Sequence, residues 1–364
     1  MSIRLALIFG GRSAEHEISI ISARSVAKAI DPKKYRLTPI YITKSGKWVG
    51  RSLSQKVLET DYEQLIKDLT ALHKVEAEVE AAADKSGFKF DFSQFDVAFP
   101  VLHGSFGEDG TIQGLFEMHQ IPFVGCGVLA SALTMDKAFS KICFKAAGLN
   151  VAKYLVYWRE DLEARLKEVV AESEQKIGYP MFVKPARSGS SVGISKVKNR
   201  AQLQKALQLA GEYDEKILVE QGIDARELEV SVLGNRSLEV SVVGEIVPVN
   251  EFYDYEAKYV KSGSQLIIPA ELPKRVAEKA RAAAATAFRA TGCEGMARVD
   301  FFLERKTNRL YINEINSIPG FTSISMYPKL FEASGVPYPE LIDRLITLAF
   351  ERYEAKKKNK IAFL

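Results

Sequence analysis

Two apolar segments with oxygen-bearing side chains at regular positions constrain the fold most strongly: residues 298–303 (RVDFFL) and residues 311–320 (YINEINSIPG). Both patterns predict β-strands, and the Pro-Gly pair ends the second one. Glu314 and Asn316 are two residues apart, so they point to the same face of their strand. If the two strands are neighbours, Asp300 on the first strand can lie beside Glu314 and Asn316 on the second.

These three side chains predict a cation site. Hard oxygen ligands without His or Cys suit Mg²⁺, which keeps waters and substrate phosphates as its other ligands. Each residue alone could equally be a strand end or turn former, because buried polar groups are commonly just hydrogen-bonded. Buried Asp and Glu are rare unless paired or bound to metal. Together with Arg298, the set therefore indicates a protein that uses ATP.

Composition bounds the class of protein. The 364 residues suffice for two or three domains, and 47% hydrophobic content is typical of globular chains. With 50 basic and 46 acidic residues, the net charge of +4 does not favour nucleic acid or an anionic membrane as partner. Three widely spaced cysteines without a CxxC pattern argue against disulfides and zinc. The first apolar run is broken at Gly10-Gly11, too soon for a signal peptide, and no run has transmembrane length, so we expect a cytoplasmic protein.

The amino-terminal residues predict the opening of an open α/β sheet. An apolar strand over 3–9 is followed by a glycine turn and by helical spacing over 13–30. Glu15 falls in the first helical turn, where the helix dipole alone could explain it. The functional alternative is that Glu15 holds an ammonium group. His103 follows the strand at 95–102, where open sheets place ligands, although it could also be a core histidine.

A glycine-rich segment at 189–193 is predicted to form the tip of a β-hairpin whose backbone N–H groups can face phosphate oxygens. It matches neither a Walker A loop nor a dinucleotide-binding fingerprint. Lys184 and Lys137 could flank a triphosphate as point charges. Glu220 ends an apolar strand and Glu227 follows it. They could contact adenosine, or they could be solvated acids in a turn.

The chain resembles the D-alanine–D-alanine ligase family of the ATP-grasp superfamily almost from end to end. Only residues 50–90, predicted to be a surface helix and connector, lie outside recognisable motifs. The resemblance rests on an ordered set of motifs: GGRSAEHEIS (10–19), HGSFGEDG (103–110), MDK (135–137), KPARSGSSVG (184–193), EQGIDARELEV (220–230), EFYDYEAKY (251–259), GMARVDFF (295–302) and NEINSIPGFTSISMYPKL (313–330).

The resemblance implies a mixed α/β and α+β fold. An amino-terminal doubly wound α/β domain (1–125) would bind the first D-alanine and form a homodimer. Central (126–220) and carboxy-terminal (221–364) ATP-grasp domains would clamp ATP. The implied reaction makes D-alanyl-D-alanine for peptidoglycan through an acyl phosphate, and releases ADP and phosphate.

The resemblance also implies roles for the ATP side of the site. Two Mg²⁺ ions, for which Mn²⁺ can substitute, would bridge the phosphates. The metal ligands would be Asp300, Glu314 and Asn316, and the ATP-binding residues would be Lys137, Lys184, Ser191, Glu220, Glu227 and Lys258.

On the D-alanine side, the implied roles are substrate binding, oxyanion stabilisation and closure. Glu15 would hold the first ammonium group, with His103 beside it. Arg298 and the Gly320 backbone N–H would stabilise the tetrahedral oxyanion. The second carboxylate would be taken by Ser325 and the backbone at Met326. Tyr259 and Ser190, bonded to each other and to Glu15, would close the loop at 251–262 over the site and exclude water.

Rival interpretations remain. The chain could be a D-alanine–D-lactate or D-alanine–D-serine ligase of the same superfamily. Tyr259 argues against the lactate form, because related depsipeptide ligases carry Phe there. A non-catalytic ATP-binding regulator would be expected to lose a metal ligand or the glycine hairpin, and this sequence loses neither.

Overall fold

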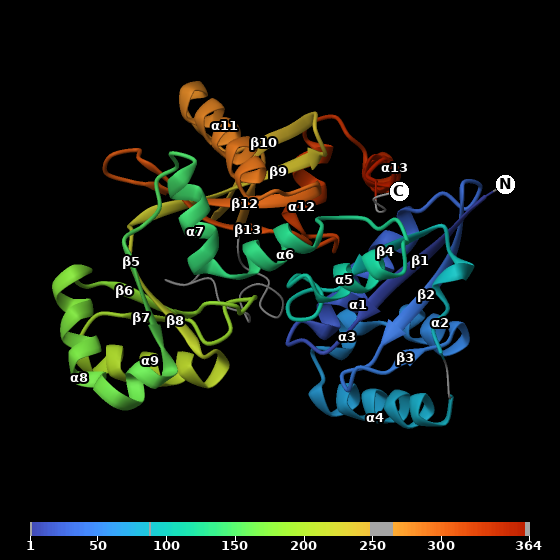
Figure 1. Ribbon diagram of the computed structural model, residues 1–364, viewed down its shortest axis with the longest axis horizontal. Helices are drawn as coiled ribbons and strands as arrows, with labels where there is room; N and C mark the ends of the chain where they lie inside the picture. Colours follow the sequence, from blue (N-terminus) through green and yellow to red (C-terminus); the bar gives the residue numbers. More distant parts are fainter. Residues whose placement is uncertain (1, 87–88, 248–264, 361–364) are drawn as a thin grey trace.

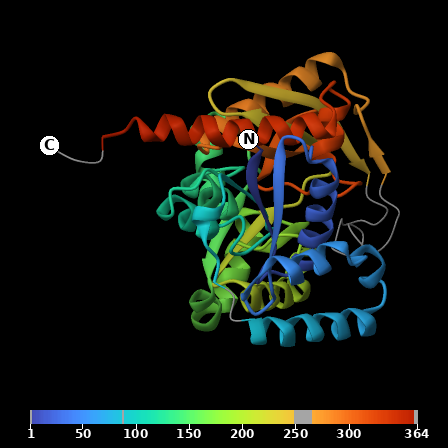
Figure 2. The same ribbon diagram turned by 90° about the vertical axis from the view of Figure 1, so that its right-hand side faces the viewer.

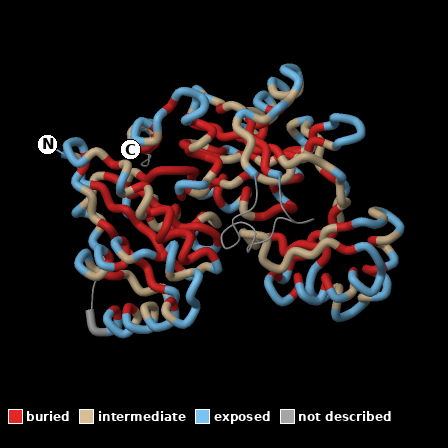
Figure 3. Tube along the Cα trace, turned by 180° about the vertical axis from the view of Figure 1, so that it is seen from behind, coloured by how far each residue is buried: buried red, intermediate tan, exposed pale blue. Residues whose placement is uncertain are grey.

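The computed structural model describes residues 2–86, 89–247 and 265–360. In these ranges the chain forms three β-sheets, each with its own helices, and the buried residues follow the strands and the inner helix faces (Figure 1, Figure 3). None of the helices in these ranges combines the length and apolarity needed to span a bilayer.

The amino-terminal sheet has the strand order β3-β2-β1-β4. Strand β1 runs parallel to both β2 and β4, whereas β3 is an antiparallel edge. The predicted strand–glycine turn–helix opening is confirmed. The elements of this region are β1 (Ile3–Gly10), α1 (His16–Ala29), β2 (Tyr35–Ile42), β3 (Trp48–Val49), a 3₁₀ turn (Phe92–Gln94), β4 (Val97–Val101) and α5 (Thr111–Met118).

Residues 50–86 differ from the single surface helix that was predicted. They form three helices: α2 (Arg51–Glu59), α3 (Tyr62–Leu65) and α4 (Leu69–Ser86). Val57, Tyr62 and Val79 are buried in the amino-terminal core. The abundant charged and alanine residues concealed this spacing, and the chain leaves the helix at Thr60, whose backbone is extended.

The central sheet has the order β5-β8-β6-β7 and is fully antiparallel. Strands β6 and β7 pair with each other, with Met181 opposite Val197 and Val183 opposite Ser195. This pairing confirms the hairpin predicted around the glycine segment. Helices α8 and α9 pack on this sheet. The elements are β5 (Tyr154–Trp158), α8 (Arg159–Lys176), β6 (Met181–Pro185), β7 (Ser195–Val197), α9 (Arg200–Tyr213) and β8 (Lys216–Gln221).

The carboxy-terminal sheet has the order β11-β10-β9-β12-β13 and is also antiparallel. Helix α11 covers one face of this sheet, and Phe144 of α7 joins its core. The elements are α6 (Val128–Met135), α7 (Lys137–Ala146), β9 (Ala225–Gly234), β10 (Leu238–Val247), β11 (Gln265–Ile267), α11 (Lys274–Ala290), β12 (Gly295–Glu304), β13 (Leu310–Asn316) and α12 (Met326–Glu332).

The last helix, α13 (Tyr338–Lys357), returns to the amino-terminal region (Figure 2). Leu341, Ile342 and Leu345 are buried in the same cluster as Leu5 and Phe99. Arg352 of this helix donates to the carbonyl of Phe123 over 2.7 Å and also to that of Gly125. The domain boundaries at residues 125 and 220 stay a prediction.

Candidate active site

A cavity of about 570 Å³ opens where the three sheets meet. Its wall includes residues of the amino-terminal, central and carboxy-terminal regions. Those that the sequence predicted are Glu15, His103, Lys137, Lys184, Ser190, Ser191, Glu220, Glu227, Arg298, Asp300, Glu314, Asn316, Gly320, Ser325 and Met326. The structure thus brings all the described candidates to one cavity; Lys258 and Tyr259 lie outside the described residues.

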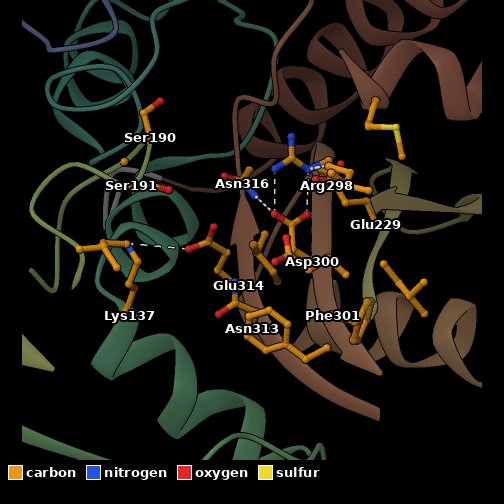
Figure 4. A pocket seen from close by; sticks show the side chains of 18 of the residues that line it. Lys137, Ser190, Ser191, Glu229, Arg298, Asp300, Phe301, Asn313, Glu314 and Asn316 are labelled. Atoms are coloured by element: carbon orange, nitrogen blue, oxygen red, sulfur yellow. Dashed lines mark hydrogen bonds and ion pairs between the residues drawn. The ribbon is translucent and has the colours of Figure 1, made fainter. Parts of the chain in front are cut away.

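The paired strands β12 and β13 bring the predicted acidic residues together. Asp300 lies opposite Glu314, and the register shifts directly after Asp300, which leaves Asn313 as the extra residue of a β-bulge. The bulge changes which side chains face the core, so Ile312 and Ile315 are both buried while Glu314 and Asn316 face the cavity. Figure 4 shows Glu314 and Asn316 beside Asp300.

Arg298 is held by two carboxylates. Its Nε and Nη2 atoms each lie 2.8 Å from an oxygen of Asp300, and its Nε lies 2.9 Å from Glu229 Oε2 (Figure 4). Burial opposes its charge, but these carboxylates raise the pKa of Arg298 well above its ordinary value. A planar guanidinium held in this way is preorganised, because it does not need to reorient when negative charge develops nearby.

The cavity residues fit a magnesium ion by their chemistry. Asn316 donates its amide N–H to Asp300 Oδ2 over 3.0 Å, so its ligating atom, the amide oxygen, is not used by that bond. Each carboxylate oxygen offers more than one acceptor direction. No group of three His, Cys, Asp or Glu side chains suited to a metal occurs among the described residues, so this candidate relies on two carboxylates and one amide.

Lys137 of α7 lies between the glycine hairpin and the acidic residues of β13. Lys137 begins α7, and its Nζ donates to the carbonyl of Ser188 over 2.6 Å and lies 3.9 Å from Glu314 Oε2 (Figure 4). Ser190 and Ser191 in the same hairpin have left-handed backbones, with φ of 45° and 61°. The Val192 N–H closes this turn on the Gly189 carbonyl, and the two serines line the cavity as candidates for contacts with phosphate oxygens.

A buried charge cluster of two ammonium groups and one carboxylate lies beside this hairpin. Glu220 lies 2.5 Å from Lys141 Nζ and 2.5 Å from Lys184 Nζ. Burial would raise the pKa of Glu220, but the two lysines lower it to about 2. Burial lowers the pKa of Lys141. The cluster has one excess positive charge, which an anion in the cavity can balance.

Glu15 meets the glycine hairpin directly. The Ser190 hydroxyl donates to Glu15 Oε1, as expected from the resemblance. Two glycines permit this approach: a Cβ at Gly189 would lie 2.5 Å from Glu15 Oε2, and one at Gly104 would lie 2.9 Å from it. Glu15 is 9% exposed and its carboxylate lines the cavity, so it is placed to bind a cationic group.

The segment after β13 forms the opposite wall. Ser325 precedes α12, and its hydroxyl contacts Thr322 Oγ1 at 2.8 Å and accepts the Thr322 N–H at 3.0 Å. A Cβ at Gly320 would lie 2.6 Å from Ser325 Oγ. Gly320 therefore allows the backbone and this hydroxyl to approach each other.

Sequence reasoning missed Lys141, Glu229 and Glu108. Lys141 and Glu229 pair with residues distant in the sequence, so no local pattern marks them. Glu108 lies in the HGSFGEDG motif and lines the cavity. Burial and the nearby Glu15 carboxylate raise the pKa of Glu108 to about 8, against the opposing effect of two backbone N–H donors and Arg298.

This shift predicts a pH-dependent stability. A folded-state pKa above the unfolded value means that the folded chain binds more protons, so the Glu108 contribution is present in acid and is lost as the pH rises through about 8. We expect the stability difference between wild type and Glu108→Gln to change by up to about 1.4 kcal/mol per pH unit between the two pKa values. Denaturant unfolding at pH 5.5, 6.5 and 7.5 measures it, and parallel pH curves for both proteins would contradict it.

Comparisons with known proteins identify the family of this chain. Family models of the D-ala D-ala ligase N-terminus and C-terminus match residues 4–126 and 143–347. A D-alanine–D-alanine ligase of Chloroherpeton thalassium is 59% identical over 362 residues, which cover 98% of this chain and 99% of the relative. One of Chlorobium phaeovibrioides is 50% identical over 357 residues, with 98% and 99% covered.

Solved structures extend the comparison. The D-alanine-D-alanine ligase from Coxiella burnetii has a TM-score of 0.80 at 32% identity, covering 98% of this chain and 96% of that chain. The VanG D-Ala:D-Ser ligase from Enterococcus faecalis has a TM-score of 0.79 at 35% identity, with 96% and 100% covered. The ATP-grasp fold prediction is confirmed. With both family models matched and relatives aligned along nearly the whole length, this chain belongs to the D-alanine–D-alanine ligase family.

Proposed function

We propose that this chain joins two D-alanine molecules into D-alanyl-D-alanine, with ATP as the energy source, for peptidoglycan precursor synthesis. The observation that supports the proposal is a single cavity whose wall combines the side chains of Asp300, Glu314 and Asn316 with those of Lys137, Lys184 and Glu15. A non-catalytic regulator would need only the ATP side. Glu15, whose carboxylate is placed to bind a cationic group, is not needed for ATP binding alone.

On the ATP side, Lys137, Lys184 and the hairpin N–H groups hold the phosphates. The excess positive charge of the Lys141–Glu220–Lys184 cluster attracts the triphosphate. Asp300, Glu314 and Asn316 would hold magnesium, which neutralises charge on the transferring phosphoryl group when bound. In the structure Glu220 contacts two lysines, so its predicted contact with adenosine has to form beside these ion pairs. Ser191, Glu227 and Lys258 keep their predicted roles in ATP binding.

On the D-alanine side, Glu15 binds the ammonium of the first molecule and leaves its carboxylate directed at the γ-phosphate. Once the acyl phosphate forms, the amine of the second D-alanine attacks its carbonyl carbon. Arg298 and the Gly320 N–H then stabilise the oxyanion. Ser325 and the Met326 N–H bind the second carboxylate. Tyr259 completes closure over the site, because an acyl phosphate must be kept from water.

We further propose that the enzyme acts in the cytoplasm as a homodimer. Large apolar side chains are exposed in the amino-terminal half: Met118 at 85%, Leu129 at 72% and Leu69 at 63%. Met118 and Leu129 lie on α5 and α6, two helices that contact each other, so a partner that covers both helices would bury both side chains. Light scattering coupled to size exclusion tests the dimer, and a mass of one chain at micromolar concentration would reject it.

Phosphate release tests the function. We expect release with ATP and D-alanine, none with L-alanine, and D-alanyl-D-alanine as the separated product. A D-alanine–D-serine ligase is the second candidate, because one similar structure is a D-Ala:D-Ser ligase. A competition of D-alanine against D-serine and D-lactate distinguishes these functions. Exclusive formation of the mixed product would overturn the first.

The contact between the glycine hairpin and Glu15 gives a mutational prediction. In Gly189→Ala the new Cβ collides with the Glu15 carboxylate, so the hairpin or the carboxylate must move. We expect kcat/KM for D-alanine to fall by about tenfold or more, as for other displaced binding groups. Gly114→Ala in α5 is the control, because no heavy atom lies within 4 Å of its Cβ position. Equal activity of the two variants would contradict the assignment of Glu15.

A further inference from the structure

The segment Ile318–Phe321 carries Gly320 into the cavity wall, yet its backbone is held by side chains of the amino-terminal region. The Ile318 N–H donates to Glu108 Oε1 over 3.2 Å. The Ile318 carbonyl lies 3.1 Å from His103 Nδ1. Ile318 therefore has both its backbone N–H and its carbonyl hydrogen-bonded to side chains of the HGSFGEDG motif, which lies more than two hundred positions earlier in the sequence.

The hydrogen bonds continue into α1. His103 Nε2 lies 3.0 Å from Ser22 Oγ, which accepts the Phe321 N–H at 3.4 Å. Because Nδ1 must donate to a carbonyl, Nε2 accepts from the Ser22 hydroxyl, which requires the neutral imidazole. Burial lowers the pKa of His103 and favours this form. Glu108 Oε2 accepts the Gly104 N–H over 2.8 Å, which ties the network back to the residue after His103.

These contacts lie on both sides of Gly320, whose backbone N–H is the proposed oxyanion donor. Glycine has the widest backbone freedom of any residue, so Gly320 on its own would not hold its N–H in one direction. On one side Ile318 is fixed at both polar groups, and Pro319 has a locked φ. On the other side the Phe321 N–H is bound by Ser22 and the Phe321 carbonyl accepts from the Tyr338 hydroxyl at 3.1 Å.

We propose that Ser22, His103 and Glu108 are positioning residues that fix the backbone around Gly320 and so aim its N–H at the carbonyl under attack. The proposal rests on the function proposed above. It gives His103, whose two ring nitrogens are both engaged within the protein, a role that needs no direct contact with substrate. It also links the region that holds Glu15 to the oxyanion side of the cavity.

The reaction has two chemical steps, and a positioning role at Gly320 should affect them differently, whereas a general structural role should affect both. In the first step a carboxylate oxygen bonds to the γ-phosphorus, the bridging P–O bond breaks and ADP forms. In the second step the amine bonds to the carbonyl carbon, the C–O bond to phosphate breaks, and the amine proton passes to the departing phosphate. A tetrahedral oxyanion arises only in the second step. Loss of positioning should therefore slow the second step and spare the first.

Positional isotope exchange measures the first step. ATP carrying ¹⁸O in its β,γ-bridge loses the label from the bridge when the acyl phosphate forms reversibly, and dipeptide formation reports both steps. We expect Glu108→Ala to lower dipeptide formation on the order of 10²-fold, the usual cost of misplacing a reacting group. The ratio of exchange to dipeptide should rise by a similar factor, with KM for ATP unchanged.

Two further variants sharpen the test. Ser22→Ala keeps the Glu108 bonds, should raise the same ratio by a smaller factor, and serves if Glu108→Ala does not fold. Gln113→Met is the matched control, because Gln113 is a buried amide that binds the carbonyl of Gly107 in the same motif over 2.6 Å. It should leave the ratio at the wild-type value.

The outcomes are distinct. Equal loss of exchange and dipeptide in the folded variants, or no loss of either, would overturn the positioning role. A rise in the ratio for Gln113→Met as large as for Ser22→Ala would also overturn it, because any disturbance of the motif would then suffice. Wild type that shows neither exchange nor dipeptide would reject the proposed function itself.

Discussion

Glu314→Gln and Asn316→Ala are each expected to reduce ligation on the order of 10³-fold while the protein stays folded, because metal stabilisation of transferring phosphate contributes several kcal/mol. Both side chains face the cavity from β13, and Asn316 is bonded to Asp300 across the strand pair. Gln keeps the size of Glu314 but removes its charge. The measurement is dipeptide formation over a magnesium titration, with a thermal melt for each variant.

The matched control for this prediction is Glu304→Gln. Glu304 is a carboxylate at the end of the same strand pair but is not part of the cavity wall, and it accepts the Thr307 hydroxyl instead. Its loss should leave activity near wild type. Normal turnover of Glu314→Gln or Asn316→Ala at saturating magnesium would remove these residues from the cation site.

Glu220→Gln is expected to destabilise the central region by about 3–5 kcal/mol, the usual cost of leaving a buried charge without its partner. It would leave the ammonium groups of Lys141 and Lys184 together without a carboxylate between them. Lys141→Met should cost well under half as much, because the pair of Glu220 and Lys184 remains. Glu220→Gln is expected to lose more stability because it leaves two buried positive charges without a negative one, whereas Lys141→Met leaves one of each sign.

Tryptophan fluorescence can report this region separately. The chain has two tryptophans, Trp48 in the amino-terminal sheet and Trp158 at the end of β5. In a Trp48→Phe background, Trp158 alone follows denaturant unfolding of the central sheet. If Lys141→Met lost more stability than Glu220→Gln, the prediction that repulsion between the two unpaired ammonium groups dominates would be contradicted.

The strand pair and the hairpin were predictable because their signals are local. Period-two spacing placed Glu314 and Asn316 on one face, and glycines marked the hairpin at 189–193. The ordered motifs then gave the family. The bulge at Asn313 was not predictable, because it depends on how two strands register across a sheet. Residues 50–86 were misjudged because their buried side chains are scattered among charged ones.

Contacts between residues that are distant in the sequence were also not predictable. Lys141 lies in an amphipathic helix between two other lysines, and nothing near it distinguishes a buried ammonium from an exposed one. Its partner Glu220 is 79 residues away. Likewise, no spacing rule connects Glu108 to Ile318. Such pairs are set by tertiary packing, which single-sequence patterns do not contain.

The return of α13 to the amino-terminal core affects how the chain folds during synthesis. Leu341, Ile342 and Leu345 complete a hydrophobic cluster whose other members include Leu5 and Phe99. These contacts join the two ends of the chain, so the region that leaves the ribosome first stays open along one side until the last helix has been made. Until then its apolar surface would be open to chaperones, and a chain that stops before α13 would be a target for proteolysis.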